Sequence, residues 1–133
     1  MWLLKTEPSS YGYDDLEKEG RAAWDGVKNP VALANLRKMT EGDAVFIYHT
    51  GSEKAVVGTA LVMRAAYPDP GARDPRLVVV DLEPTGRLAR PVTLAELSKV
   101  PAFADSPLIR QPRLSVVPLT KRQWNALARI VPE

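Results

Sequence analysis

The stretch DAVFIYHTGSEKAVVGTALVMRA, residues 43–65, contains the two most strand-like segments of the chain. β-branched and aromatic residues dominate both segments, and Gly51 lies between them, where a turn is expected. We therefore predict core strands over residues 43–50 and 55–65. Gly58 interrupts the second strand, which is typical of a bulge or of a close approach by another part of the backbone.

Further apolar segments on either side show the same preference, and we predict strands over residues 2–5, 77–83 and 113–119. A short acidic helix is expected over residues 13–19, ended by Gly20. The helices and strands do not alternate as regularly as a doubly wound parallel sheet requires. The pattern predicts the α+β class, with a mainly antiparallel, curled sheet that forms a small β pseudo-barrel and with helices at its periphery.

Helix-start signals mark three other places. Asn29 precedes Pro30, and Asn can cap the free amide groups of a first turn in which Pro loses no hydrogen bond. This pair predicts a helix that ends near Met39. Thr93 and Thr120 are each followed three residues later by Glu or Gln, the spacing of a capping box, so a helix should begin at each.

Length and composition indicate a single globular unit. The chain has 133 residues, of which 45% are hydrophobic, enough for one core and too few for two independent domains. We therefore predict one domain over residues 1–133.

No stretch has the roughly 20 apolar residues that span a membrane, and Lys5 and Glu7 interrupt the segment where a signal peptide would be apolar. We expect a cytoplasmic monomer without a membrane partner.

Residues for metal and catalytic chemistry are scarce. The chain has no cysteine and one histidine, His49, so thiolate sites, disulfides and the usual transition-metal ligand sets are excluded. The sequence also lacks the GxxxxGK[ST], GxGxxG and GxSxG motifs. A catalytic triad would have to use His49, and the sequence shows no activated serine near it. We expect no metal, no cofactor and no enzymatic activity.

Positive charge gathers toward the C-terminus. Residues 106–132 include no acidic residue and five basic ones, Arg110, Arg113, Lys121, Arg122 and Arg129. A segment of this kind can attract phosphate groups. It can equally form a solvated face that only keeps the protein soluble. Charge alone leaves both interpretations open.

The segment WDGVKN, residues 24–29, combines a large aromatic residue with hydrogen-bonding side chains in a loop that leads into a helix. Trp24 has the shape to stack on a nucleobase, and Asp25 or Asn29 has the groups to pair with its polar edge. The alternative is that Trp24 packs in the core and Asn29 only caps the helix. The residue types are compatible with both.

Several segments together resemble one family. They are WLLKTEP (2–8), WDGVKNPVALANLRKM (24–39), GDAVFIYHT (42–50), AYPDP (66–70), RPVTLAEL (90–97) and LIRQPRLSVVPLT (108–120). Their order and types are similar to those of the EVE domain, a member of the PUA-like superfamily together with the YTH and ASCH domains. The resemblance covers nearly the whole chain, so it does not depend on one short motif.

The resemblance implies a PUA-like pseudo-barrel whose concave face accepts a base, and a partner that is DNA or RNA carrying a modified base, such as methylated or hydroxymethylated cytosine. By motif, the implied base pocket consists of Lys5, Ser9, Trp24, Asp25, Val27, Asn29, Tyr48, His49 and Thr50. The implied phosphate contacts are Lys28, Arg110 and Arg113. At Thr50 the family often has Ser, so the hydroxyl is kept and the extra methyl group narrows the expected pocket.

Two other functions remain as alternatives. Some ASCH-type proteins resemble small amidohydrolases of modified nucleosides, and Lys5, Thr6 and Glu7 offer an amine, a hydroxyl and a carboxylate. Successive strand residues point to opposite faces, so Thr6 is expected to face away from the other two. The remaining alternative is a protein-interaction module whose concave surface binds a peptide.

Overall fold

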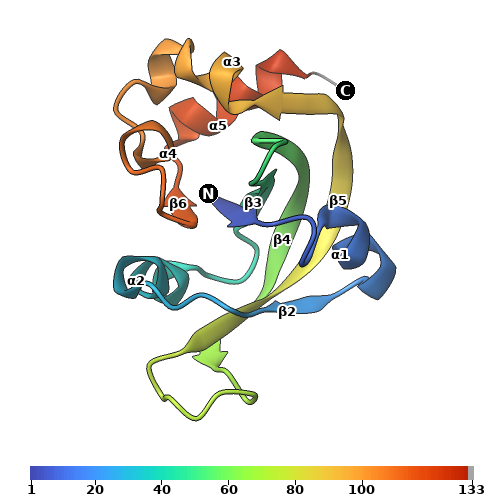
Figure 1. Ribbon diagram of the computed structural model, residues 1–133, viewed down its shortest axis with the longest axis vertical. Helices are drawn as coiled ribbons and strands as arrows, with labels where there is room; N and C mark the ends of the chain where they lie inside the picture. Colours follow the sequence, from blue (N-terminus) through green and yellow to red (C-terminus); the bar gives the residue numbers. More distant parts are fainter. Residues whose placement is uncertain (132–133) are drawn as a thin grey trace.

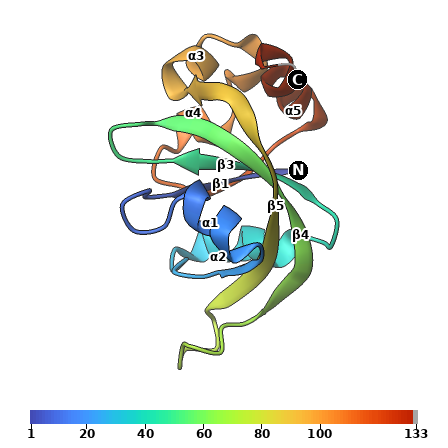
Figure 2. The same ribbon diagram turned by 90° about the vertical axis from the view of Figure 1, so that its right-hand side faces the viewer.

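A six-stranded sheet in the order β2-β5-β4-β3-β1-β6 organises the protein in the computed structural model, which describes residues 1–131. Its strands are β1 (Trp2–Thr6), β2 (Ala22–Trp24), β3 (Ala44–His49), β4 (Ala55–Pro68), β5 (Val78–Thr93) and β6 (Val116–Pro118). β1 and β3 pair in parallel, and the other pairings within residues 1–131 are antiparallel. Figures 1 and 2 show the long, strongly curved β4 and β5 curling the sheet around its core. The predicted α+β class with a curled, mainly antiparallel sheet is confirmed.

The helices lie around this sheet. They are α1 (Tyr13–Glu19), α2 (Pro30–Lys38), α3 (Leu94–Ser98), α4 (Pro107–Arg110) and α5 (Lys121–Ile130), with a 3₁₀ turn, η1, at Pro101–Phe103. In Figure 1, α3 and α5 lie at one end of the molecule, and α2 lies toward the other. None of the helices in the described part of the chain has the length and apolar character that crossing a membrane requires.

The predicted helix starts are confirmed by their caps. The Asn29 side chain accepts hydrogen bonds from the amides of Val31 and Ala32. Thr120 and Gln123 form a reciprocal capping box at the start of α5. These caps form as predicted because each depends on residues within one turn of the chain.

Strand lengths differ more from the sequence-based expectation. The predicted strand 77–83 continues to Thr93, because β5 pairs with β4 over most of its length, from Pro68 with Val78 to Ala55 with Thr93. Shifts in the register accompany this pairing, one of them beside Pro84. β2 was not predicted; it has three residues and is held by its antiparallel pairing with β5. Long-range pairing, rather than local composition, sets these boundaries.

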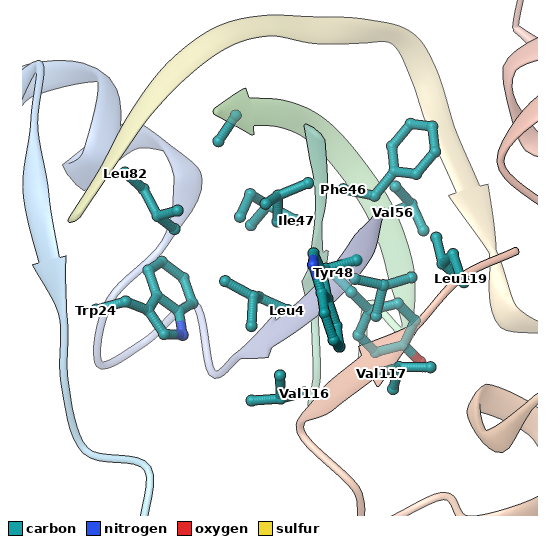
Figure 3. Packing of buried hydrophobic residues seen from close by; sticks show 14 of the residues in the cluster. Leu4, Trp24, Phe46, Ile47, Tyr48, Val56, Leu82, Val116, Val117 and Leu119 are labelled. Atoms are coloured by element: carbon teal, nitrogen blue, oxygen red, sulfur yellow. The ribbon is translucent and has the colours of Figure 1, made fainter. Parts of the chain in front are cut away.

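The core lies inside the curled sheet. In Figure 3, Leu4 of β1, Ile47 of β3 and Leu82 of β5 lie in the same cluster as Trp24 of β2. β3 is buried from Val45 to His49, so both of its faces are covered. On one face, Trp124 of α5 stacks on Phe46 with ring centroids 3.9 Å apart. Through Trp124, α5 therefore packs against the sheet.

Gly58 lies where β3, β4 and β5 lose their regular register. A Cβ atom at this position would be 2.5 Å from the ring of Tyr13, which is fully buried. The Tyr13 hydroxyl donates to the carbonyl of Thr59 at 2.7 Å and accepts from the amide of Gly86 at 3.1 Å. The expected bulge is confirmed, and the close neighbour is an aromatic ring rather than backbone.

Gly58→Ala should therefore destabilise the fold. The added methyl group would overlap a buried ring held by two hydrogen bonds, and overpacking of this kind costs about 1–3 kcal/mol in the free energy of unfolding. Urea denaturation followed by tryptophan fluorescence measures this loss. Gly71→Ala is the control, because the nearest atom to its new Cβ is a side-chain oxygen at 3.4 Å. Equal losses for the two variants would contradict the steric argument.

Candidate functional site

A cavity of about 270 Å³ opens beside the segment that connects β2 to α2. Its wall comes from the end of β1 with Glu7, from Tyr11, from β2 with residues 25–28, and from Ser115. These segments are far apart in the sequence. β2 forms one edge of the sheet and β1 lies next to the opposite edge strand, and the curl of the sheet brings the two together (Figure 1). A cavity just below the usual volume range of small-molecule sites has room for one small planar group rather than for a large ligand.

Trp24 and Tyr11 supply the aromatic wall. Their rings meet edge to face, with centroids 6.0 Å apart and an interplanar angle of 86°. Trp24 is only 6% exposed, and it lies in a strand whose register places it opposite Val80. Trp24 therefore packs in the core, as one interpretation expected, and also lines the cavity. Its stacking on a nucleobase stays a prediction. Its ring is fixed before any ligand arrives.

The hydroxyl of Tyr11 is buried and forms no hydrogen bond with the described residues. Burial raises the pKa of this hydroxyl above its ordinary value, and the nearby Glu19 carboxylate raises it further. Tyr11 therefore stays neutral at physiological pH. Unpaired buried polar groups are uncommon, and each one in a native structure calls for an explanation such as a bound ligand or an ordered water.

Lys5 is half-buried at the cavity and is held from two sides. Its Nζ donates to the carbonyl of Pro112 at 2.9 Å and lies 5.5 Å from the ring centroid of Tyr48. Burial lowers the pKa of the Lys5 ammonium from its ordinary value. Tyr48, expected in the pocket, does not line the cavity among the described residues and instead packs beneath Lys5.

Glu7 places a carboxylate at the cavity. It accepts hydrogen bonds from the amide and hydroxyl of Ser9, at 3.2 and 3.0 Å, and from the hydroxyl of Thr50 at 3.2 Å. The Ser9 amide is the main reason why the pKa of Glu7 lies below its ordinary value. Ser9 and Thr50 were expected in the pocket, but the described lining does not include them. They orient Glu7, which does line it.

Thr6 also lines the cavity, although strand alternation predicted that it would face away from Lys5 and Glu7. β1 ends at this residue, so the alternation does not extend to Glu7. The Thr6 hydroxyl donates to the carbonyl of Tyr11 at 2.6 Å. This bond ties the loop that carries Tyr11 to the end of β1.

His49 lies in the protein interior rather than along the described cavity wall. Its Nε2 accepts a hydrogen bond from the amide of Tyr13 at 3.0 Å, and its Nδ1 is 2.7 Å from a carboxylate oxygen of Glu53. The first bond satisfies a free amide at the start of α1, and the second fixes the tautomer with a proton on Nδ1. His49 therefore holds α1 in place.

The predicted phosphate contacts have different surroundings. Lys28 lines the cavity. Arg113 lines a neighbouring open cleft together with Asn29 and the exposed Val31. Arg110 donates to the carbonyl of Ala104 at 3.1 Å and does not line the described wall of either space. Lys28 and Arg113 thus flank the cavity more closely than Arg110 does.

Sequence motifs located only part of this site. The predicted residues Lys5, Trp24, Asp25, Val27 and Lys28 line the cavity, whereas Asn29 caps α2 next to it. The structure adds Thr6, Glu7, Tyr11, Ala23 and Ser115, none of which had been assigned to the pocket. Ser115 lies in the family-like segment 108–120, from which only Arg110 and Arg113 had been assigned a role, and Tyr11 lies outside all six such segments. The fold brings both residues to the cavity.

Comparison with known proteins gives a consistent family. The EVE domain family model matches residues 1–130. A protein of Rhodopseudomonas palustris, solved by NMR, is 38% identical, with a TM-score of 0.91 over 98% of this chain and 91% of its own. Thymocyte nuclear protein 1 of Homo sapiens is 27% identical, with 93% of this chain and 70% of the human protein aligned.

Two further solved structures are similar to this chain in fold. Human THYN1 protein has been solved as a crystal structure in complex with 5-methylcytosine-containing DNA. Its sequence is 25% identical to that of this chain, with a TM-score of 0.89 over 99% of this chain and 97% of that chain. An ASCH protein of Zymomonas mobilis has a TM-score of 0.64 at 14% identity, covering 99% and 96% of the two chains. The second likeness concerns the fold alone and confirms the PUA-like architecture.

The role of Asn29 can be tested by stability. Asn29→Ala removes the acceptor for two amides at the start of α2 and should lower the free energy of unfolding by about 1 kcal/mol. Asn29→Ser keeps an oxygen at the cap and should recover most of this loss. Chemical denaturation of the three proteins measures the difference. A serine variant no more stable than the alanine variant would show that capping is not what Asn29 contributes.

Proposed function

The chain belongs to the EVE domain family, and from that premise we propose that it binds DNA carrying a modified base, which it holds in the cavity beside Trp24. The main support is the cavity itself, which combines a fixed aromatic wall with polar groups at its edge. The related human protein in complex with 5-methylcytosine-containing DNA supports DNA as the partner and cytosine as the base. The proposed activity is binding alone, and the bound base is not chemically changed.

The side chains of the cavity suit a methylated cytosine. Trp24 and Val27 present apolar surface to the ring and its methyl group. Carboxylates accept hydrogen bonds from the exocyclic amine of cytosine, and both Asp25 and Glu7 line the cavity. Lys5 adds a positive charge beside the carbonyl edge of the base. This combination distinguishes a base from a purely apolar ligand.

The energetics are compatible with a base turned out of the double helix. Extrusion costs a few kcal/mol, and stacking on an aromatic side chain returns about 1–3 kcal/mol. Hydrogen bonds to the base edge and contacts to the flanking phosphates must supply the remainder. Because Trp24 is already fixed by β2 and the core, little side-chain entropy is lost when the base binds.

The amidohydrolase alternative has less support from the same side chains. The Lys5 amine donates to a backbone carbonyl, and the Glu7 carboxylate is bound by Ser9 and Thr50. Lys5 and Glu7 form no ion pair within residues 1–131. A nucleophile with an adjacent base, which covalent catalysis requires, is not assembled there.

The test is to fill the cavity without removing core residues. Ala23 is exposed between two buried neighbours in β2 and lines the cavity, so Ala23→Phe adds bulk while leaving the core unchanged. We expect wild type to prefer methylated over unmethylated oligonucleotides, and Ala23→Phe to lose that preference and bind methylated DNA about tenfold or more weakly, as expected when stacking is lost. Fluorescence anisotropy measures both affinities.

Ala95→Phe is the matched control, because Ala95 is exposed on α3, at the other end of the molecule from α2 (Figure 1), and does not line the described cavity wall. It should bind both oligonucleotides as wild type does. Denaturation curves of the two variants verify that both are folded. If folded Ala23→Phe keeps the wild-type preference for methylated DNA, the base does not enter this cavity.

A further inference from the structure

A second, larger groove of about 540 Å³ lies between α2 and the loop at residues 69–77 that joins β4 to β5. Figure 1 shows this loop and α2 at the same end of the molecule, away from α3 and α5. The groove has an apolar floor that includes the buried Leu33 and the half-buried Leu77. Basic side chains line its edge, so the groove is amphipathic rather than simply hydrophobic.

Three cations and one carboxylate line the groove, namely Lys28, Arg37, Arg76 and Asp74. Asp74 is fully engaged by Arg76, with Nε to Oδ1 at 3.1 Å and Nη2 to Oδ2 at 2.8 Å. This pairing neutralises the carboxylate and leaves Lys28 and Arg37 as the uncompensated charges. The groove therefore favours an anion.

The positions of these cations are set by backbone contacts. Arg37 donates one hydrogen bond, from Nη2 to the carbonyl of Arg76 at 2.6 Å, and its other donors form no bond with the described residues. The loop itself is fixed by bonds from the amide of Asp69 to the carbonyl of Leu77 and from the amide of Leu77 to the carbonyl of Asp74. The groove is thus formed before a ligand binds, with arginine donors available.

Lys28 connects this groove to the base cavity, because this residue lines both. The groove and the cavity therefore adjoin each other at this residue. Successive phosphates along an extended strand are separated by about the length of one lysine side chain. An anionic, partly apolar polymer that enters the cavity at one residue would place its next residue here.

We propose that this groove holds the backbone of the DNA strand immediately next to the base in the cavity. A phosphate lies between Lys28 and Arg37, and the adjoining sugar packs against Leu33 and Leu77. The inference rests on the proposed function, since the cavity must hold a base for the groove to hold its neighbour. It assigns affinity to the groove and base selectivity to the cavity.

The experiment measures binding of a DNA duplex with one 5-methylcytosine and of its unmethylated counterpart, at several salt concentrations. Arg37→Gln removes one charge while keeping a side chain of similar length, and Arg122→Gln removes one from the exposed start of α5. Arg37→Gln should weaken binding of both duplexes about tenfold, leave their affinity ratio unchanged, and reduce the salt slope by about 0.9. Arg122→Gln should leave affinity and slope near wild type.

Uncharged methylphosphonates placed on either side of the modified base complete a double-mutant cycle. Neutralising one flanking phosphate should weaken binding of wild type and of Arg122→Gln, and should weaken binding of Arg37→Gln by a smaller factor, because in that variant only the contact with Lys28 is left to lose. Additive losses at both flanks would overturn the proposal, as would an Arg37→Gln protein that behaves like Arg122→Gln. In either case a retained preference for methylated DNA would leave the proposed function intact.

Failure of the proposed function gives different results. If wild type ignores methylation but Arg37→Gln still loses affinity and coupling, the groove is supported as a backbone site and the base pocket is refuted. If wild type binds none of the duplexes, both proposals are overturned. Ala23→Phe serves as the reciprocal control, because it should change the methylation preference while keeping the coupling between Arg37 and the phosphate.

Discussion

The contacts of Tyr13 hold β3, β4 and β5 together beside the base cavity. Its backbone amide is bound by His49 of β3, its ring fills the space above Gly58 of β4, and its hydroxyl bonds to backbone on β4 and β5. One residue at the start of α1 thus contacts three adjacent strands. Because Tyr11 precedes it by two residues, the position of Tyr13 also fixes the ring that meets Trp24 at the cavity. Fold and site share this constraint.

The cavity wall consists of residues that are also structural. Trp24 packs among Leu82 and other core side chains (Figure 3), and its strand is held at the sheet edge by pairing with β5. A recognition ring built into a strand has one orientation, which lowers the entropy lost on binding. The same arrangement means that truncating Trp24 would remove core packing together with the binding surface. A variant that fills the cavity therefore separates binding from stability better than one that deletes the aromatic ring.

Local signals and long-range contacts explain which features the sequence could predict. The caps at Asn29 and Thr120 were predictable because they involve residues within a few positions. The second half of β5 was not, because its extended form depends on pairing with β4 rather than on its own composition. At the site, the motif around Trp24 was found, whereas Tyr11 was not, since nothing in its neighbours marks it. His49 was expected at the pocket from the family motif, and the sequence carries no mark of its hydrogen-bond partner, the amide of Tyr13.

The short segment between Trp24 and Asn29 is fixed at both ends and open in the middle. Pairing of Trp24 with Val80 holds the first end, and the cap at Asn29 holds the other. Gly26 between them has φ of 79°, a backbone conformation that favours glycine, and no atom lies within 4 Å of where its Cβ would be. Exposed side chains on this segment, such as Lys28, are therefore presented on a defined backbone without contributing to the core. Their identity can change the affinity for the ligand while Asn29 preserves the start of α2, so affinity and stability depend partly on different residues of the same loop, whereas Trp24 contributes to both.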